Sequence, residues 1–299
     1  MKKPHIYLIS VVLTVLLIFS LLVTGCLILI RFKGLDTDTA LNIAKEKNLA
    51  ERVHISLTQR FTDLENATGI PPSVYENSIT TEKCDAIIQE TIRNGFGYLN
   101  GRNADVSVSP DFSVLETDLR AFLSEYAEAH NVEKDAGYEL AVKNATNAAK
   151  QEILDSCDVY RFGTMYEAKA LQKAQRILKW TGFLAVGAGL ITLLILLFLF
   201  MANHAEGRHG FYWGGIGVII SAILLLVPAL WLSRTHWFDR FAVKTDQVFA
   251  AVTGYLYTMT DAAAAFALCE IAAGAVMILL FVLMHLRSRK AAALRSGKH

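Results

Sequence analysis

A run of 22 uncharged residues, from Trp180 to Met201, constrains this chain more than any other feature. At a rise of about 1.5 Å per residue, a helix of this length crosses the hydrocarbon core of a bilayer. Helix-periodic, charged sequence precedes the run, and further apolar sequence follows it. The run therefore predicts a membrane-spanning helix that joins a water-facing segment to a membrane bundle.

Three more apolar runs have the length of a membrane span: Tyr7 to Ile30, Phe211 to Leu232 and Ala262 to Leu286. The chain of 299 residues is 53% hydrophobic, and its apolar residues are concentrated in these runs, as in a multi-pass membrane protein. Only Ala202 to Gly210 separates the second run from the third. So short a link predicts an antiparallel helical hairpin.

The segment from Asp36 to Arg176 has a different composition, with 23 acidic and 15 basic residues. Its apolar residues recur at helical steps, and strand alternation is not convincing anywhere in it. Asn48 and Gly69 are expected helix ends, and Thr80 is an expected helix start. The predicted fold is therefore all-α: a four-helix transmembrane bundle with an extracytoplasmic helical domain inserted between the first and second spans.

The sequence divides into five segments on this reading. Good helix formers fill the chain from Thr164 to Met201, so one unbroken helix is expected to enter the membrane there. Gly163 is expected to end the preceding helix. The segments are a first transmembrane helix (1–35), the helical domain (36–178), a transmembrane hairpin (179–232), an amphipathic loop with a short surface helix (233–261), and a fourth transmembrane helix with a basic tail (262–299).

Basic residues decide the orientation. The positive-inside rule places a strongly basic tail in the cytoplasm. An even number of spans then puts both termini in the cytoplasm of a multi-pass protein of the cell membrane, and the acidic domain lies outside. An acidic outer domain excludes nucleic acid as the expected partner. The tail residues are Arg287, Arg289, Lys290, Arg295 and Lys298.

The sequence contains none of four common catalytic or phosphate-binding motifs: G-x-x-x-x-G-K-[ST], G-x-G-x-x-G, H-E-x-x-H and G-x-S-x-G. His204 and His209 share a short loop in which Glu206 is the only carboxylate, so solvated loop histidines are favoured over a metal site. We therefore expect no enzyme activity, no catalytic residues, no metal and no cofactor.

Two cysteines, Cys84 and Cys157, belong to the outer domain, where a disulfide is chemically allowed. The alternative is two buried thiols, because Cys84 lies on the apolar stripe of its helix. Cys26 ends Leu22-Val23-Thr24-Gly25-Cys26, which resembles a lipoprotein lipobox. A spanning helix is favoured there over lipidation, because the apolar run continues beyond Cys26.

Glu270 is the one acid inside an apolar run, and an intramembrane carboxylate is a functional candidate. The alternative is a protonated packing residue. Thr24 and Thr192 are the polar groups expected nearby, and Pro228 leaves the carbonyl of Leu224 without its helical donor. Small residues around Glu270 share its face, which predicts that Glu270 points into the bundle.

Two features together resemble a known group of proteins. One is the helix Leu49 to Leu64 followed by Gly69-Ile70-Pro71-Pro72-Ser73-Val74-Tyr75 and Ile79-Thr80-Thr81-Glu82. The other is the order of one span, a large helical domain and three spans. Together they resemble a loose group of uncharacterised multi-pass membrane proteins of Gram-positive bacteria. The group has no established activity, so the resemblance implies an architecture and no site residues.

The leading functional hypothesis is non-catalytic. The outer domain is expected to bind, sense or scaffold a protein or cell-envelope partner, while the bundle anchors it among membrane lipids. The alternative is a transport or channel component that uses Glu270. The two differ in whether Glu270 must release a proton.

Overall fold

The computed structural model describes residues 4–204 and 208–296, and these are helical with connecting turns and no strand. The chain divides into two compact units. The membrane unit comprises Met1–Gly34, Trp180–Arg240 and Leu256–His299. The helical unit comprises Leu35–Lys179 and Phe241–Tyr255. The sequence boundaries expected at 35/36 and 178/179 lie one residue from this division.

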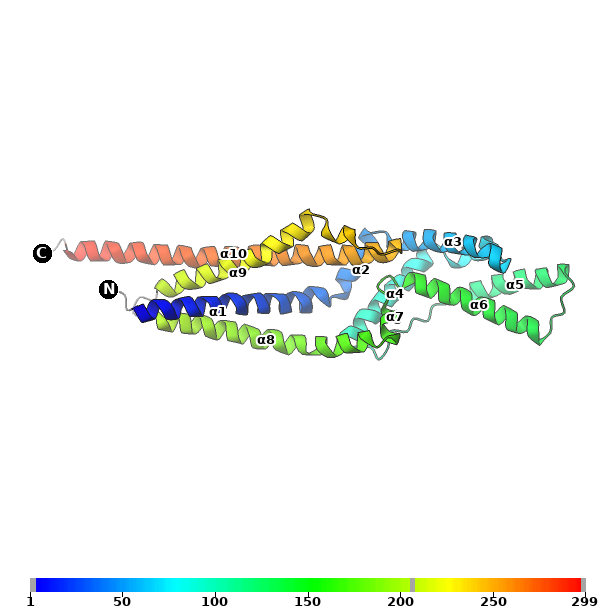
Figure 1. Ribbon diagram of the computed structural model, residues 1–299, viewed down its shortest axis with the longest axis horizontal. Coiled ribbons are helices and arrows are strands. Elements are labelled where there is room, and N and C mark those ends of the chain that lie inside the picture. The colour runs from blue at the N-terminus through cyan, green and yellow to red at the C-terminus, as the bar shows by residue number, and fades with distance from the viewer. Residues whose placement is uncertain (1–3, 205–207, 297–299) are drawn as a thin grey trace. The chain divides into compact units, whose positions relative to one another are not determined.

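Within residues 4–204 and 208–296, four helices are long and apolar enough to cross a membrane, as expected of a multi-pass membrane protein. All four run through the membrane unit, where α1 lies beside both α8 and α9 (Figure 1). A π-helical turn, η1 (Ile30–Gly34), follows α1. The four helices are α1 (Pro4–Leu29), α8 (Ala170–Ala202), α9 (Arg208–Arg234) and α10 (Asp246–Ser296).

Glycines bring the spanning helices close together. A Cβ on Gly215 of α9 would lie 3.0 Å from the carbonyl oxygen of Gly274 on α10, and the reverse distance is the same. A Cβ on Gly217 would lie 3.1 Å from Leu17 of α1, whose side chain is fully buried. Because these contacts join helices of one chain, the glycines of the third span serve packing within the bundle.

The outer surface of the bundle is apolar. On α8, Phe183, Val186 and Leu193 are each more than 60% exposed. Gly189, in the same helix, has no atom within 4 Å of a built Cβ. An exposed apolar surface on a helix of this length is suited to contact with lipid tails.

The helical unit is built from short helices around one apolar core. Apolar side chains on α3, α4 and α6 fill this core, and the rings of Phe61 and Tyr75 stack within it at 3.9 Å. The helices are α2 (Thr37–Glu46), α3 (Leu49–Thr68), α4 (Thr81–Leu99), α5 (Ser113–Ala129), α6 (Ala136–Cys157) and α7 (Phe162–Glu167), with 3-10 turns η2 (Pro72–Val74) and η3 (Glu76–Ser78).

The expected helix ends in the first half of this unit are confirmed. Asn48 has φ +50° and separates α2 from α3, and Gly69 has φ +70° at the end of α3. The Thr80 hydroxyl accepts from the N–H of Lys83, so Thr80 is the N-cap of α4.

Two predictions about breaks were wrong. Gly163 lies inside α7 and ends no helix. The helix expected to run unbroken from Thr164 to Met201 is interrupted at Lys169, where φ is +57°, and is continuous only from Ala170. Neither glycine nor proline marks this break. At this turn the Gln172 side chain donates a hydrogen bond to the carbonyl oxygen of Tyr166.

The segment expected to be an amphipathic loop, 233–261, is different. It holds the end of α9, the 3-10 turn η5 (Trp237–Arg240) and the first four turns of α10, which begins at Asp246. From there α10 continues for 51 residues without interruption. No proline interrupts this stretch, and its two glycines, Gly254 and Gly274, are helical and lie close against neighbouring helices.

Candidate functional site

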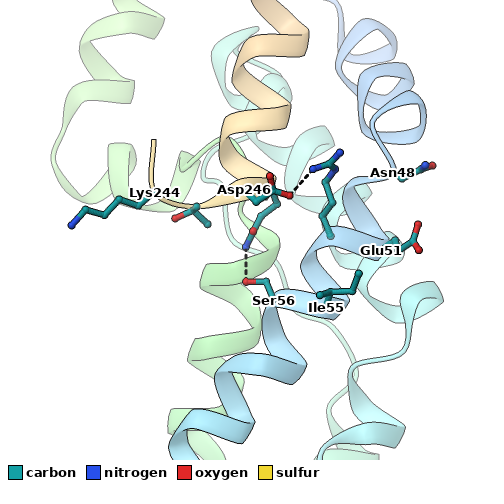
Figure 2. Close-up of a pocket in the computed structure, with 9 residues that line it drawn as sticks. Asn48, Glu51, Ile55, Ser56, Lys244 and Asp246 are labelled. Carbon is teal, nitrogen blue, oxygen red and sulfur yellow. Dashed lines mark hydrogen bonds and ion pairs between the residues drawn. The ribbon is translucent and has the colours of Figure 1, made fainter. Parts of the chain in front are cut away.

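The first turn of α10 and one face of α3 enclose a pocket of about 670 Å³ in the helical unit (Figure 2). We name it the α3–α10 pocket. Polar side chains of both signs make up most of its wall. Figure 2 shows Lys244 extending away from Asp246 on one side, with Glu51 and Ile55 on the other. The lining residues are Asn48, Glu51, Arg52, Ile55, Ser56, Lys244, Thr245, Asp246 and Gln247.

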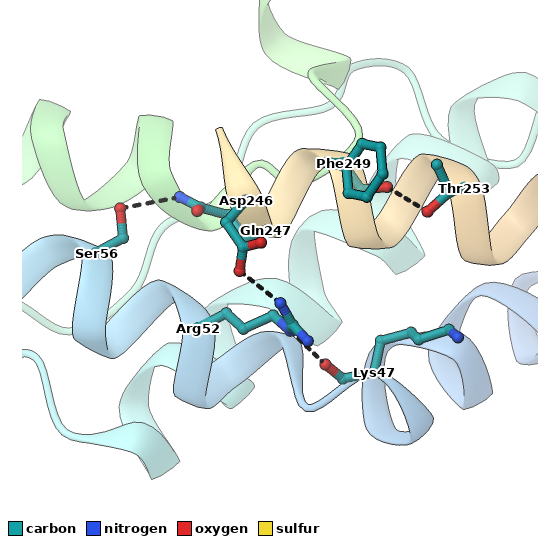
Figure 3. A network of polar contacts seen from close by, with 7 residues as sticks. All are labelled: Lys47, Arg52, Ser56, Asp246, Gln247, Phe249 and Thr253. Carbon is teal, nitrogen blue, oxygen red and sulfur yellow. Dashed lines mark hydrogen bonds and ion pairs between the residues drawn. The ribbon is translucent and has the colours of Figure 1, made fainter. Parts of the chain in front are cut away.

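Arg52 ties the two walls of the pocket together (Figure 3). Its Nη1 lies 2.5 Å from Oδ2 of Asp246, and its Nε donates to the carbonyl oxygen of Lys47 at 2.9 Å. That carbonyl stands at the end of α2, where the left-handed Asn48 turns the chain into α3. The side chains of Arg52 and Asp246 are 41% and 67% exposed, so water and a ligand can reach the pair.

Gln247 fixes the start of α10 on α3. Its side chain is only 2% exposed, and its Nε2 lies 3.4 Å from Oγ of Ser56. Ala250 and Ala251 follow it into the apolar core of the helical unit. At Gly254 a Cβ would lie 3.0 Å from Ile43 of α2, so a small residue is needed there. The first turns of α10 are therefore an integral part of the core.

The α3–α10 pocket presents groups that can bind a polar or charged ligand. Its lining includes two cations, two carboxylates, two hydroxyls and two amides, which are groups that can form hydrogen bonds or ion pairs with a ligand. It contains no cysteine or histidine. Among the described residues, no group of three or more His, Cys, Asp or Glu side chains is placed to hold a metal ion. Glu206, in the loop that contains His204 and His209, lies outside the described residues. Lys298 of the basic tail also lies outside them.

Intramembrane polar side chains form a seam between α1 and α8. Thr192 Oγ1 lies 2.7 Å from Ser20 Oγ and 3.1 Å from Thr24 Oγ1. Nearer the other end of these helices, the Asn203 amide donates to Ser10 Oγ at 2.9 Å, and both side chains are buried. The structure thus brings together the two predicted threonines and adds Ser10, Ser20 and Asn203, which sequence reasoning missed.

Glu270 does not join this seam. It is half-buried on α10, between the fully buried Ala267 and the buried Gly274. Within the described part of the chain its carboxylate makes no hydrogen bond, either to a threonine or to the Leu224 carbonyl near Pro228. The hydroxyls of Thr24 and Thr192 are occupied by each other and by Ser20. Glu270 is therefore a half-buried acid without a hydrogen-bond partner among the described residues.

The remaining candidates are the cysteines. Cys84, in the first turn of α4, and Cys157, the last residue of α6, are both free thiols buried in the apolar core of the helical unit. Cys26 is a free, exposed residue within α1.

Sequence reasoning missed the α3–α10 pocket because it assigned 233–261 to an amphipathic loop whose short helix was expected to lie on the bilayer surface. A usable signal was present. Gln247, Ala250, Ala251 and Gly254 follow helical steps of three, one and three, which is a narrow face of small residues with a polar start. No protein-family model, curated protein sequence or solved structure matches this chain.

Proposed function

We propose that this protein is a membrane-anchored binding and sensing module. On this proposal the helical unit lies on the extracytoplasmic side and takes a protein or cell-envelope partner at the α3–α10 pocket. The membrane unit anchors it and carries no chemistry of its own. One observation supports this most strongly: α10 is a single helix that starts in the core of the helical unit and continues as the fourth span.

The continuity of α10 supports sensing as well as anchoring. Gln247, Ala250 and Ala251 hold its first turns in the core, and the pocket is built on those same turns. A partner that binds Asp246 or displaces Arg52 from it acts directly on the beginning of a helix that crosses the membrane. A stable helix transmits such a displacement because its backbone hydrogen bonds hold each turn to the next.

The charge distribution supports the proposed orientation. The segment from Asp36 to Arg176 carries an excess of acid, and the remainder of the chain carries an excess of base. Basic residues next to spans are retained on the cytoplasmic side, whereas a large inserted domain is translocated largely regardless of its charge. With four spans, a cytoplasmic tail places the inserted unit on the opposite side of the membrane.

Site-specific photo-crosslinking in intact cells tests the proposed binding. A photoreactive amino acid replaces Ile55, which lines the pocket and is 60% exposed. The matched control replaces Val132, which is 49% exposed in the same unit and does not line the pocket. We expect one defined adduct from position 55 and none from position 132. Adducts of equal yield from both positions, or none from position 55, would contradict a partner at this pocket.

A second candidate function, proton-coupled transport, has one observation in its favour: the half-buried, unpaired Glu270 within a span. Glu270→Gln separates the two. Glutamine keeps the size and hydrogen-bonding capacity of the protonated acid but cannot release a proton. If the protein anchors a binding module, the variant should retain normal abundance and normal crosslinking from position 55. If it transports, the variant should reach the membrane in normal amounts and lose ion flux in proteoliposomes.

A further inference from the structure

The third and fourth spans, α9 and α10, stay in contact as far as one end of the membrane unit. Beyond their glycine contacts, the rings of Tyr212 and Phe281 lie with centroids 5.2 Å apart. Seven residues further along α10, the hydroxyl of Ser288 accepts a hydrogen bond from Nη1 of Arg208, the first residue of α9. We name the place where Arg208 and Ser288 meet the α9–α10 junction.

Aromatic rings indicate the depth of this junction in a bilayer. Trp213 packs against Tyr7 and Tyr212, with ring centroids 5.4 and 5.5 Å away. Trp231 follows 18 positions later on α9, about 27 Å along a helix, which is close to the thickness of a bilayer's hydrocarbon core. Trp and Tyr are enriched at both interfaces of a membrane. With these rings at the two interfaces, Arg208 lies about 7 Å beyond Trp213, in the layer of phospholipid headgroups.

The junction is surrounded by an excess of positive charge. Arg287 and Arg289 flank Ser288 on α10, and both are exposed. In the link before α9 the sequence has one acid, Glu206, which lies outside the described residues. No Asp or Glu occurs in the described segments that form this end of the bundle, namely 4–10, 199–204, 208–215 and 274–296.

The opposite end of α9 lacks such an excess. Arg234 ends the helix there, three positions beyond Trp231, and Arg240 ends the following 3-10 turn. Two carboxylates balance these arginines: Asp239 lies in the same turn, and Asp261 lies 3.4 Å from the hydroxyl of the residue before Arg234. An exposed arginine at a comparable depth of the same helix therefore has acids close by, whereas Arg208 is surrounded by further arginines.

We propose that the α9–α10 junction binds the phosphate of an anionic phospholipid such as phosphatidylglycerol. A guanidinium presents a planar set of N–H donors that matches phosphate oxygens, and the bond to Ser288 holds that of Arg208 at the contact between the two helices. Basic groups between spans at headgroup depth are suited to anionic headgroups. Leu283 and Leu279, both exposed, follow inward along α10 and offer a surface to the acyl chains of the same lipid.

The charge of the headgroup decides which lipid is bound. Phosphatidylcholine has the same phosphate but adds a quaternary ammonium, which the surrounding arginines repel. A Lys or Arg close to an anionic membrane surface strengthens binding about five-fold. This inference concerns the membrane unit alone, so it holds for either orientation of the protein and does not depend on the α3–α10 pocket.

Native mass spectrometry of the full chain tests the lipid preference. Protein purified in detergent is equilibrated with equimolar phosphatidylglycerol and phosphatidylcholine of identical acyl chains, and the lipids retained on the protein are counted. We expect phosphatidylglycerol to be retained about five-fold more than phosphatidylcholine. Equal retention of the two lipids would overturn the proposal.

A soluble competitor separates the whole lipid from its phosphate. Glycerol 3-phosphate, added at the concentration of the phosphatidylglycerol, has the anionic group without acyl chains. We expect it to leave the bound lipid in place. Displacement of the lipid would show that the junction recognises a free phosphate ester, and the assignment to a phospholipid would be wrong.

Matched variants locate the site. Arg208→Gln should lower the preference for phosphatidylglycerol about five-fold, while Arg234→Gln, at the opposite end of the same helix, should leave it unchanged. Ser288→Ala keeps every charge but removes the hydroxyl that positions Arg208, and it should cause a smaller loss. If Arg208→Gln does not fold, Ser288→Ala takes its place in the comparison with Arg234→Gln. An equal loss at both ends of α9, or no loss from either junction variant, would contradict a site at the junction.

Discussion

Gly95, on the buried face of α4, is the position where a single added methyl group should cost the helical unit most. A Cβ built there would lie 2.2 Å from Cδ2 and 2.4 Å from Cε2 of Phe162. That ring is 4% exposed and packs edge-on against Phe96, with ring centroids 5.5 Å apart. The ring therefore cannot move aside without disturbing the aromatic core around it.

Two opposing terms set the size of the effect of Gly95→Ala. Alanine favours a helix interior over glycine by about 1 kcal/mol. Inserting a methyl group into a filled core costs about 1–3 kcal/mol, and a contact this short belongs at the upper end of that range. We expect a net loss of about 2 kcal/mol in the free energy of unfolding. For a unit of this size that corresponds to a midpoint lower by roughly 4–8 °C.

The assay must report on the helical unit and not on the bundle. All four tryptophans, Trp180, Trp213, Trp231 and Trp237, belong to the membrane unit, so tryptophan emission is unsuitable. Alkylation of the buried Cys84, followed by mass spectrometry during a temperature ramp, reports opening of the correct core. Far-UV circular dichroism in the same detergent gives the overall loss of helix.

Two variants control for the helix-propensity term. Gly189→Ala adds the same methyl group to a helix where no atom lies within 4 Å, and it should leave Cys84 alkylation unchanged. Phe162→Leu in the Gly95→Ala background removes the clashing ring and should restore part of the lost stability. If Gly95→Ala is as stable as the native chain, or if the double variant shows no coupling, the argument from close packing is wrong.

Three further predictions concern other parts of the chain. Protease added to protoplasts should cleave the helical unit and spare the basic tail; cleavage of the tail alone would reverse the orientation. Gly274→Leu should lower bundle stability, measured by thermal aggregation in detergent, while Gly189→Leu should not, because only Gly274 meets a neighbouring backbone. Burial raises the pKa of Asp158 despite donors from Phe162 and Gly163, so the folded state holds its proton more tightly than the unfolded state. The unfolding free energy should therefore fall as pH rises through the interval above the ordinary aspartate pKa, and urea titrations should show that Asp158→Asn removes this slope.

Most of the secondary structure could be predicted because local signals mark it. The four apolar runs needed only length and hydropathy, and Asn48, Gly69 and Thr80 end or begin helices for reasons of backbone conformation and capping. The break at Lys169 could not be predicted in this way. A lysine has no local preference for φ +57°, so surrounding contacts must impose that conformation.

The sites were harder to predict than the helices, since they depend on which helices become neighbours. Thr24 and Thr192 were chosen as partners for Glu270, yet α1 and α8 pair them with each other. Cys84 and Cys157 could be named as a pair only because the domain holds no other cysteine. Nothing in the sequence pattern placed the end of α6 against the start of α4.

The start of α10 shows why one continuous helix was predicted as a short surface helix within a loop, separate from the fourth span. The exposed ion pair between Arg52 and Asp246 is worth only about 0–1 kcal/mol and cannot hold this segment by itself. Packing of Ala250 and Ala251 in the core supplies the apolar burial, and Gly254 allows close approach to α2. Gln247 adds specificity, because its buried amide needs the Ser56 hydroxyl and a helix shifted by one residue would leave it unpaired. The side chains that pack this part of α10 against the helical unit are small, and a periodic pattern of large apolar residues does not include them.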